Sequence, residues 1–264
     1  MSAELRDLAL EVAREAAALV RQRREAGVEV AATKSSDVDV VTEADRASET
    51  LIVERLLARR PHDGLVGEEG SDRQGTSGVR WVIDPIDGTV NFLYGLPQYA
   101  VSIAAETDGE VVAGVVVNAA TRVEYAAAKG LGATRDGIPL RVRPPAPLHQ
   151  RLVLTGFGYD AGLRAVQAAA TARLLPRVRD IRRLGSCALD LCHVAEGAAD
   201  GYVEEGTHLW DYAAGGLVAT EAGARFLLLP GAGGRPVLLC APAHGFDEFC
   251  AAVADAGFLA AERE

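Results

Sequence analysis

A buried strand runs into a tight turn and a short helix in the stretch Trp81-Val82-Ile83-Asp84-Pro85-Ile86-Asp87-Gly88-Thr89-Val90-Asn91-Phe92. Periodicity does not distinguish a strand from a buried helix in the apolar run before Asp84, but the Asp-Pro and Asp-Gly steps that bound this run favour a strand. Both aspartates should therefore lie at the carboxyl end of a strand, beside a helix start whose free N–H groups favour anions. Two carboxylates next to an anion-binding turn predict a site where a metal ion bridges protein and phosphate. The ordinary alternative is a strand followed by an Asp-capped helix.

Composition limits the kind of protein. The chain has 264 residues, 49% of them hydrophobic and 24% charged, which is typical of a soluble globular protein with one large domain or two packed halves. The net charge of −10 argues against a nucleic-acid partner or an acidic membrane surface. Glu4 and Asp7 stand where a signal peptide would be basic, and no apolar stretch could span a bilayer. These features predict a cytoplasmic protein.

The cysteines indicate neither disulfides nor a zinc site, because no C-x-x-C pair or matching His spacing occurs. We expect burial as small apolar side chains in a reducing compartment. The four cysteines are Cys187, Cys192, Cys240 and Cys250.

The first half of the chain predicts two helices and an antiparallel sheet packed against them. Apolar residues from Leu5 to Val20 recur at helical spacing, and this helix should end near Gly27. A second helix should stop before Pro61. A short strand at 66–70 leads into a polar loop. Further strands are predicted at 81–83, 101–103, 111–117, 124–128 and 132–135.

The second half predicts alternating helices and strands, a pattern typical of a mixed sheet. Pro144-Pro145-Ala146-Pro147 is the expected boundary, so residues 1–143 form an α+β half and residues 144–264 an α/β half. Strands are expected at 152–154, 180–184, 201–203, 225–229 and 237–240, and helices at 162–173, 187–196, 212–222 and 246–256.

Other acidic groups occur far from Asp84 in the sequence. Thr42 and Asp45 open the second helix, Glu68 follows a strand, and Asp211 opens a later helix. Taken singly, these residues fit helix caps or a solvated turn. Together they form the ordered series Asp-x-Val-Thr-x-Ala-Asp, Gly-Glu-Glu, Trp-Val-Ile-Asp-Pro-Ile-Asp-Gly-Thr-x-Asn-Phe and Trp-Asp-x-Ala-Ala-Gly.

From about Lys34 to Gly223, this series resembles the inositol monophosphatase family of magnesium-dependent, lithium-sensitive phosphatases. The resemblance implies a layered α-β-α-β-α sandwich, with an antiparallel sheet in the first half and a mixed sheet in the second. It places the site between the two halves and implies a homodimer.

The resemblance also implies a set of metal ligands. Glu68, Asp84 and the carbonyl of Ile86 would hold one Mg²⁺. Asp84 would bridge to a second Mg²⁺ completed by Asp87 and Asp211. A third, weaker ion near Glu68 is compatible with the preference of Mg²⁺ for few carboxylates and several waters.

The catalytic roles that follow from the resemblance fall on Thr89, Asp45 and Glu68. The hydroxyl of Thr89, with Asp45, would orient a metal-activated water for in-line attack, without a covalent intermediate. The N–H groups of Gly88 and Thr89 would hold phosphate oxygens. Lys34 aligns with a lysine that the family places near the catalytic water, and its alternative is an exposed loop lysine.

Substrate contacts should come from the second half of the chain, where the family's ring-binding residues match Gly185, Ser186, Cys187 and Glu204, together with Asp211. A carboxylate at 204 could accept from two neighbouring hydroxyls, although a surface strand residue is the alternative. Relatives that cleave histidinol phosphate tend to lack this glutamate and to have an aromatic residue before the glycine. Cys187 stands where alanine is usual and Asp190 where asparagine is common, which leaves the sugar preference open.

The sequence thus predicts an Mg²⁺-dependent hydrolase of a small polyol phosphate, with myo-inositol 1-phosphate favoured. The same chemistry on histidinol phosphate, fructose 1,6-bisphosphate or a 3′-phosphonucleotide is the first alternative. Two of these alternatives need a basic side chain to bind a second phosphate, and the only clear candidates are Arg182 and Arg183. A metal-binding regulatory protein without turnover is the alternative of another class.

Overall fold

The computed structural model describes residues 1–28, 30–33 and 40–260. The first half contains a long N-terminal helix, a second helix and a sheet of seven strands, with one further short helix. The strand pair β1–β2 lies apart from this sheet. The elements are α1 (Ser2–Ala26), β1 (Val30–Thr33), β2 (Val40–Thr42), α2 (Glu43–Arg59), β3 (Gly64–Gly67), β4 (Val79–Asp87), α3 (Thr89–Tyr94), β5 (Ala100–Thr107), β6 (Glu110–Asn118), β7 (Glu124–Ala128), β8 (Ala133–Arg135) and β9 (Ile138–Pro139).

The second half contains five strands in one mixed sheet, ordered β11-β10-β12-β14-β13. The strands β11, β10 and β12 run parallel, whereas β14 is antiparallel to both of its neighbours. The elements are β10 (Leu152–Thr155), α4 (Ala161–Leu174), β11 (Asp180–Arg182), α5 (Cys187–Ala195), β12 (Gly201–Glu205), α6 (Leu209–Glu221), β13 (Ala224–Pro230), β14 (Pro236–Pro242) and α7 (Phe246–Ala256).

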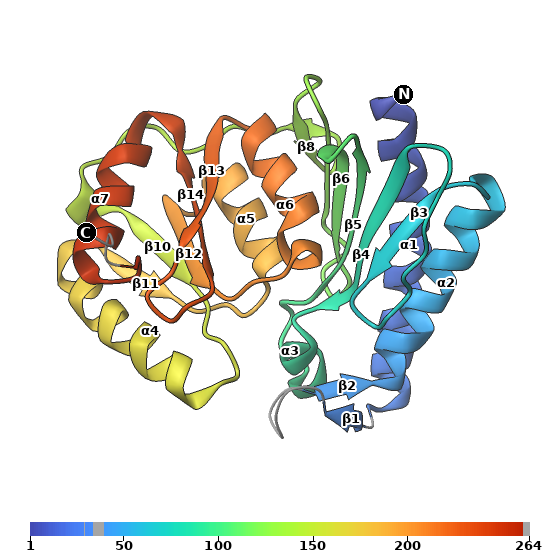
Figure 1. Cartoon of the computed structure of the whole chain (residues 1–264), viewed down its shortest axis with the longest axis horizontal. Helices are drawn as coiled ribbons and strands as arrows, with labels where there is room; N and C mark the ends of the chain where they lie inside the picture. The colour runs from blue at the N-terminus through green and yellow to red at the C-terminus, as the bar shows by residue number, and fades with distance from the viewer. Residues whose placement is uncertain (29, 34–39, 261–264) are drawn as a thin grey trace.

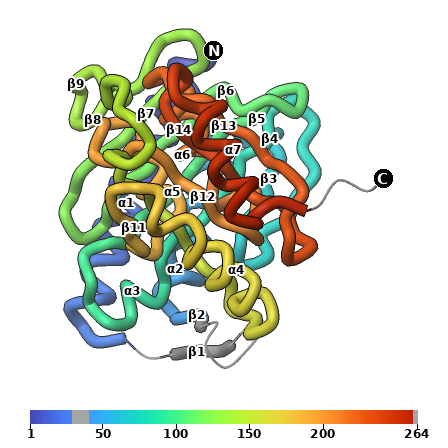
Figure 2. The backbone as a smooth tube through the Cα atoms, turned by 90° about the vertical axis from the view of Figure 1, so that its left-hand side faces the viewer, coloured from blue at the N-terminus to red at the C-terminus, as the bar shows by residue number. Residues whose placement is uncertain are grey.

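The helices and sheets stack in five layers (Figure 1). The pair α1 and α2 covers the outer face of the seven-stranded sheet, and α5 and α6 fill the space between the two sheets. The pair α4 and α7 covers the outer face of the five-stranded sheet and faces the viewer in Figure 2. The expected α-β-α-β-α sandwich is confirmed.

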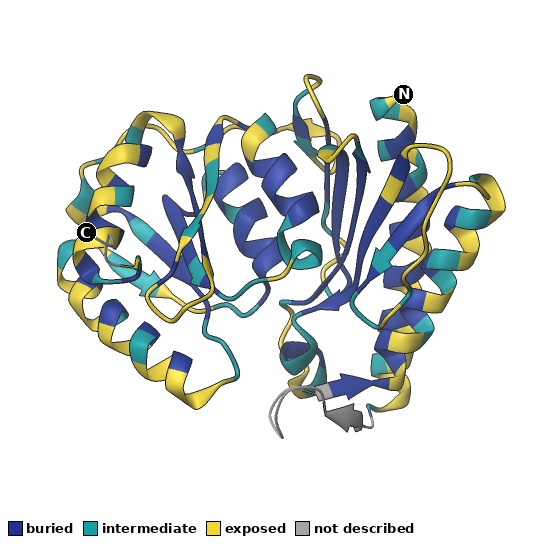
Figure 3. Cartoon of the chain, viewed as in Figure 1, coloured by how far each residue is buried: buried dark blue, intermediate teal, exposed yellow. Residues whose placement is uncertain are grey.

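Burial follows these layers. The central helices α5 and α6 are dark blue along most of their length, whereas the outer helices are exposed on one side (Figure 3). An outer helix has only one apolar face to bury, while a helix between two sheets is buried on both sides. Among the described residues, no helix is both long and apolar enough to cross a membrane.

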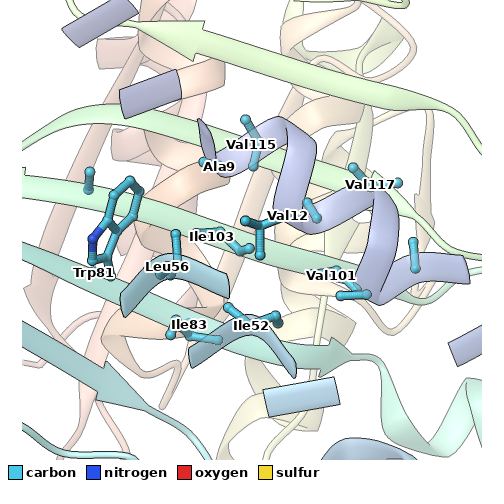
Figure 4. Close-up of a cluster of buried hydrophobic side chains, with 14 of the residues drawn as sticks. Ala9, Val12, Ile52, Leu56, Trp81, Ile83, Val101, Ile103, Val115 and Val117 are labelled. Carbon is cyan, nitrogen blue, oxygen red and sulfur yellow. The ribbon is translucent and has the colours of Figure 1, made fainter. Parts of the chain in front are cut away.

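Strand β4 is buried on both faces, so its alternating side chains enter two different cores. Trp81 and Ile83 join Val12 and Ile103 in the core beneath α1 and α2 (Figure 4). Val82 points the other way, into the core around α5 and α6. Because side chains alternate along a strand, Asp84 continues the face of Val82 and points toward the central helices.

Most predicted elements are present, with differences at their ends. The strand expected at 81–83 continues to Asp87 through an irregularity between Asp84 and Asp87, and Pro85 lies in it. A proline is tolerated there because the ladder is already interrupted. The first sheet is antiparallel except for the parallel pair β3–β4. The pair β1–β2 was not predicted from the sequence.

Candidate active site

The two aspartates of β4 lie at the end of the strand where the backbone leaves the ladder. Asp84 is 2% exposed and one of its carboxylate oxygens accepts from the N–H of Ile86 at 3.0 Å. The hydroxyl of Ser48, on α2, donates to the carbonyl of Pro85 at 3.1 Å. The irregular turn is thus held from within and from α2, which fixes where the carboxylate of Asp84 lies.

Glu68 comes to the same place from the end of β3. Its N–H donates to the carbonyl of Ile83 at 3.2 Å, which fastens the start of the loop to β4. Buried Glu49 accepts from the N–H groups of Glu69 at 2.9 Å and Ser71 at 3.0 Å. A buried carboxylate on α2 therefore shapes the loop that presents Glu68.

Asp211 reaches the site from the first turn of α6. Its carboxylate accepts from the N–H of His208 at 2.6 Å, so it caps its own helix. This helix approaches the first sheet closely, because a Cβ on Gly114 of β6 would come within 2.9 Å of the backbone of Ala214. Ser102, opposite Asp84 on β5, donates to the carbonyl of Trp210 at 3.4 Å. Small residues thus let α6 bring Asp211 to the face of Asp84.

Asp87 is held by the start of α5. The hydroxyl of Ser186 and the N–H of Ala188, at 2.7 Å, donate to one carboxylate oxygen, and the N–H of Cys187 donates to the other at 3.3 Å. These contacts join the second half of the chain to the end of β4. A helix N-terminus suits a carboxylate because its N–H groups are unpaired.

Thr89 and Asp45 form a direct contact. The hydroxyl of Thr89 lies 3.2 Å from a carboxylate oxygen of Asp45 and 3.1 Å from the carbonyl of Ile86. The other oxygen of Asp45 accepts from the N–H and the hydroxyl of Thr42, which completes a capping box at the start of α2. Burial, opposed by these hydrogen bonds, raises the pKa of Asp45 to about 6.

A cavity of about 730 Å³ opens between the two halves at these elements. Of the predicted residues, Glu68, Asp84, Ile86, Asp87, Gly88, Thr89, Gly185, Cys187, Glu204 and Asp211 line it. Asp45 and Ser186 do not line the cavity. Asp45 lies behind the lining residue Thr89, and Ser186 lies behind the lining residue Asp87. Lys34 lies outside the described residues.

The placement of Ser186 differs from the expected substrate contact. Its side chain is buried, donates to Asp87, and accepts from the N–H of Leu189 at 3.4 Å as the cap of α5. With its hydroxyl turned to the carboxylate, Ser186 acts in this structure as a support for Asp87. The neighbouring Gly185 and Cys187 remain in the cavity wall.

The carboxylates of the cavity raise one another's pKa. Burial first, then the charges of Glu68, Asp87 and Asp211, raise the pKa of Asp84 well above its ordinary value. Burial raises the pKa of Asp87 to about 7, against the hydrogen bond from Ser186. The pKa of Asp211 rises for the same two reasons as that of Asp84. A bound cation would remove this repulsion.

The donor set fits a hard divalent cation, since it consists of carboxylate and carbonyl oxygens. Within the described ranges, however, no three acidic, histidine or cysteine side chains are placed to bind one ion together. Asp87 accepts from backbone N–H groups at the start of α5, and Asp211 accepts from the N–H of His208 at the start of its own helix, α6. Mg²⁺ retains several waters and uses one or two carboxylates, so an open set is suitable for it.

Glu204 stands on the wall formed by β12. Its carboxylate accepts from the hydroxyl of Tyr202, and a Cβ on Gly156 would collide with it. Burial raises the pKa of Glu204, while the hydrogen bond and the nearby charge of Arg183 lower it. A small residue at 156 therefore leaves the room that this carboxylate occupies.

Three supporting residues were missed from the sequence. Ser48 and Glu49 follow Asp45 at helical spacing, so polar side chains at 45, 48 and 49 share the buried face of α2 with Ile52. That spacing was the available signal. The sequence contained no such signal for Ser102, because its hydrogen bond to Trp210 depends on how closely α6 approaches the first sheet.

Residues 1–254 match the inositol monophosphatase family. The chain belongs to this family. The Mycobacterium tuberculosis protein named inositol-1-monophosphatase SuhB is 47% identical, over 95% of this chain and 93% of its own.

The structure of Mycobacterium tuberculosis SuhB superimposes with a TM-score of 0.85 at 45% identity, covering 98% of both chains. An IMPase from Thermotoga maritima gives a TM-score of 0.84 at 30% identity, over 95% of this chain and 96% of that one. The Escherichia coli protein named Nus factor SuhB is 37% identical over 82% of each chain.

As a member of this family, the protein is a phosphoric monoester hydrolase, and the family acts on small phosphate esters. The family is metal-dependent, in agreement with the oxygen donors around Asp84. The cavity between the halves is accordingly its candidate active site.

Proposed function

We propose that this protein hydrolyses the phosphomonoester of a small polyol, with myo-inositol 1-phosphate as its preferred substrate and Mg²⁺ as its ion. One observation supports the substrate most directly: Glu204 lines the same cavity as Asp84, Asp87 and Thr89. A phosphate held at Thr89 would leave the polyol facing a carboxylate that can accept from two adjacent hydroxyls. Relatives named inositol-1-monophosphatase, and a staphylococcal IMPase-II structure described as bound to inositol monophosphate, support the same substrate.

The ion would be held by Glu68, Asp84 and the carbonyl of Ile86, with Asp87 and Asp211 available to a second ion. When bound, Mg²⁺ supplies charge that polarises phosphate oxygens and lowers the pKa of a coordinated water. The rest of the chemistry falls to side chains and backbone groups of this chain.

Asp45 and Thr89 would manage the proton of the attacking water. The hydroxyl of Thr89 donates toward Asp45, so its own oxygen is free to accept from a water beside the phosphorus. Asp45, buried and with a raised pKa, can take up the proton that this relay delivers. The N–H groups of Gly88 and Thr89 would bind phosphate oxygens at the start of α3.

The test is phosphate release from a panel of esters at fixed Mg²⁺, with and without EDTA. The panel contains myo-inositol 1-phosphate, histidinol phosphate, fructose 1,6-bisphosphate, 3′-phosphoadenosine 5′-phosphate and glycerol 2-phosphate. We expect the highest kcat/KM for myo-inositol 1-phosphate and loss of turnover in EDTA. Glu204→Gln should lower the preference for inositol phosphate over glycerol 2-phosphate.

Each other outcome has a definite meaning. A preference for another ester, abolished by EDTA, would keep the metal site and replace the substrate. Turnover that persists in EDTA and does not depend on the Mg²⁺ concentration would overturn the proposed requirement for Mg²⁺. Absence of turnover on every ester would favour the regulatory alternative.

A further inference from the structure

The carboxylate of Glu204 is held by a tyrosine that no sequence motif indicated. The hydroxyl of Tyr202, two residues earlier on β12, donates a hydrogen bond to it. Residues two apart share one face of a strand, so both side chains point toward the central helices. Tyr202 is fully buried in the core around α5 and α6, whereas Glu204 lines the cavity. The phenol therefore supports the carboxylate from the protein side.

A glycine at the end of the neighbouring strand bounds the space of the same carboxylate. Gly156 directly follows β10, which pairs with β12 in parallel. A Cβ on Gly156 would overlap both carboxylate oxygens of Glu204. Gly156 does not have a positive φ, so its backbone conformation does not require glycine. What glycine supplies at this position is room for the carboxylate.

The two carboxylate oxygens of Glu204 differ in their surroundings. Oε2 accepts from Tyr202, and Oε1 has no hydrogen-bond partner among the residues that the structure describes. Oε1 is also absent from the buried oxygens that lack a partner in this part of the chain, so it is accessible. A carboxylate oxygen can accept from two donors. The tyrosine thus occupies one oxygen and leaves the other for a ligand in the cavity.

We propose that Tyr202 and Gly156 are positioning residues for substrate selection, which hold the Glu204 carboxylate where adjacent hydroxyls of a polyol can reach it. The inference rests on the proposed function, in which the phosphate of the ester lies at Thr89 and its polyol meets Glu204. A buried phenol needs an acceptor, and a backbone carbonyl would serve the fold equally well. Here the acceptor is a side chain of the cavity wall, so the hydrogen bond orders a group that the substrate contacts.

The expected size of the effect follows from side-chain ordering. Without the contacts to Tyr202 and Gly156, the substrate would have to immobilise the side chain of Glu204 when it binds. Immobilising one flexible side chain weakens binding by about three- to tenfold. A loss of this kind should appear mainly in KM, because the polyol is held in the ground state as well as in the transition state.

Two variants disturb the position of the carboxylate and leave Glu204 itself in place. Tyr202→Phe removes the donor and keeps the ring in the core, and Gly156→Ala forces the end of a flexible side chain to move. We expect each variant to raise KM for myo-inositol 1-phosphate about three- to tenfold, with a smaller change in kcat. The ratio of kcat/KM for this ester to that for glycerol 2-phosphate should fall in each. Because both esters are measured on the same preparation, loss of folded protein cancels in the ratio.

The Glu204→Ala background separates positioning from a general effect on the fold. Once no carboxylate remains to be positioned, adding Tyr202→Phe or Gly156→Ala should change KM for myo-inositol 1-phosphate by less than about twofold. A structural role would give each substitution the same effect in both backgrounds.

Tyr125→Phe is the matched control. Tyr125 is also buried and its hydroxyl donates to Glu196 at 3.1 Å, but neither residue lines this cavity. The variant should keep the wild-type KM and the wild-type preference between the two esters.

The remaining outcomes separate this inference from the proposed function. A wild type that prefers myo-inositol 1-phosphate, with unchanged KM in Tyr202→Phe and Gly156→Ala, would overturn the positioning role and keep the substrate. An equal loss in Tyr125→Phe, or an equal loss in the Glu204→Ala background, would overturn it as well. A wild type without that preference, or a Glu204→Ala variant that retains it, would overturn the proposed role of Glu204 and the inference with it.

Discussion

At the scale of single residues, the Thr89 hydroxyl connects the turn after β4 to Asp45 at the start of α2. Its one hydroxyl proton has two acceptors, Asp45 and the carbonyl of Ile86. Thr89→Ala should lower kcat about 10²- to 10⁴-fold, the usual size of a proton-transfer contribution, without changing the melting temperature appreciably. Thr89→Ser retains the hydroxyl and should retain most turnover. Near-normal kcat in Thr89→Ala would remove this residue from the mechanism.

Asp45 gives the reaction an acidic limit. Its pKa is raised from an ordinary 3.8 to about 6, so it is protonated, and unable to accept a proton, below that pH. We expect kcat/KM at saturating Mg²⁺ to fall about tenfold per pH unit below pH 6. Asp45→Asn should have a low kcat/KM at every pH, and its pH profile should lack the acidic decrease. A wild-type profile that stays level down to pH 5 would contradict the assignment.

At the scale of elements, the start of α5 supports Asp87, a proposed metal ligand at the end of β4. Ser186→Ala removes a donor to Asp87 as well as the cap of α5, which should cost about 1 kcal/mol of folding stability. The pKa of Asp87 should rise further, since that hydrogen bond lowers it. The Mg²⁺ concentration needed for half-maximal thermal stabilisation should therefore increase several-fold. Ser186→Thr keeps both the hydroxyl donor and the cap, so it should retain the wild-type Mg²⁺ requirement.

At the scale of the whole molecule, the carboxylates between the halves oppose folding when no cation is bound. Their pKa values are raised in the folded state, so the native protein binds more protons than the unfolded chain, and stability falls as pH rises through about 7. In EDTA, the melting temperature should be higher at pH 6 than at pH 8. Adding Mg²⁺ at pH 8 should raise it, beyond the effect of NaCl at equal ionic strength.

Asp211→Asn is the matched variant for this prediction. An amide can still accept from the N–H of His208, so the cap of α6 is kept while one charge is removed. The variant should melt higher than wild type in EDTA at pH 8 and gain less from Mg²⁺. A lower melting temperature in EDTA would show that Asp211 stabilises the fold through its charge.

The division at residue 143 and the homodimer stay predictions.

What the sequence determined was local. The strand, turn and helix of 81–92 follow from a short apolar run and from the Asp-Pro and Asp-Gly steps that bound it, so Asp84, Asp87 and Thr89 had to be neighbours. Most helix and strand positions in both halves followed from hydrophobic spacing together with glycine, proline and turn signals. The family resemblance added Glu68, Asp211 and Glu204, which the structure brings to the same cavity.

What only the tertiary structure decided was which distant groups meet. Ser186 was expected in the cavity, yet packing of α5 against β4 turns its hydroxyl to Asp87. Glu49 and Gly156 had no motif, and they matter because of the loop and the carboxylate of Glu204 beside which they lie. The distance between α6 and the first sheet likewise depends on packing, because the small residue Gly114 permits the close approach of Ala214. Local spacing specifies each element, but only packing between elements specifies the distances across the site.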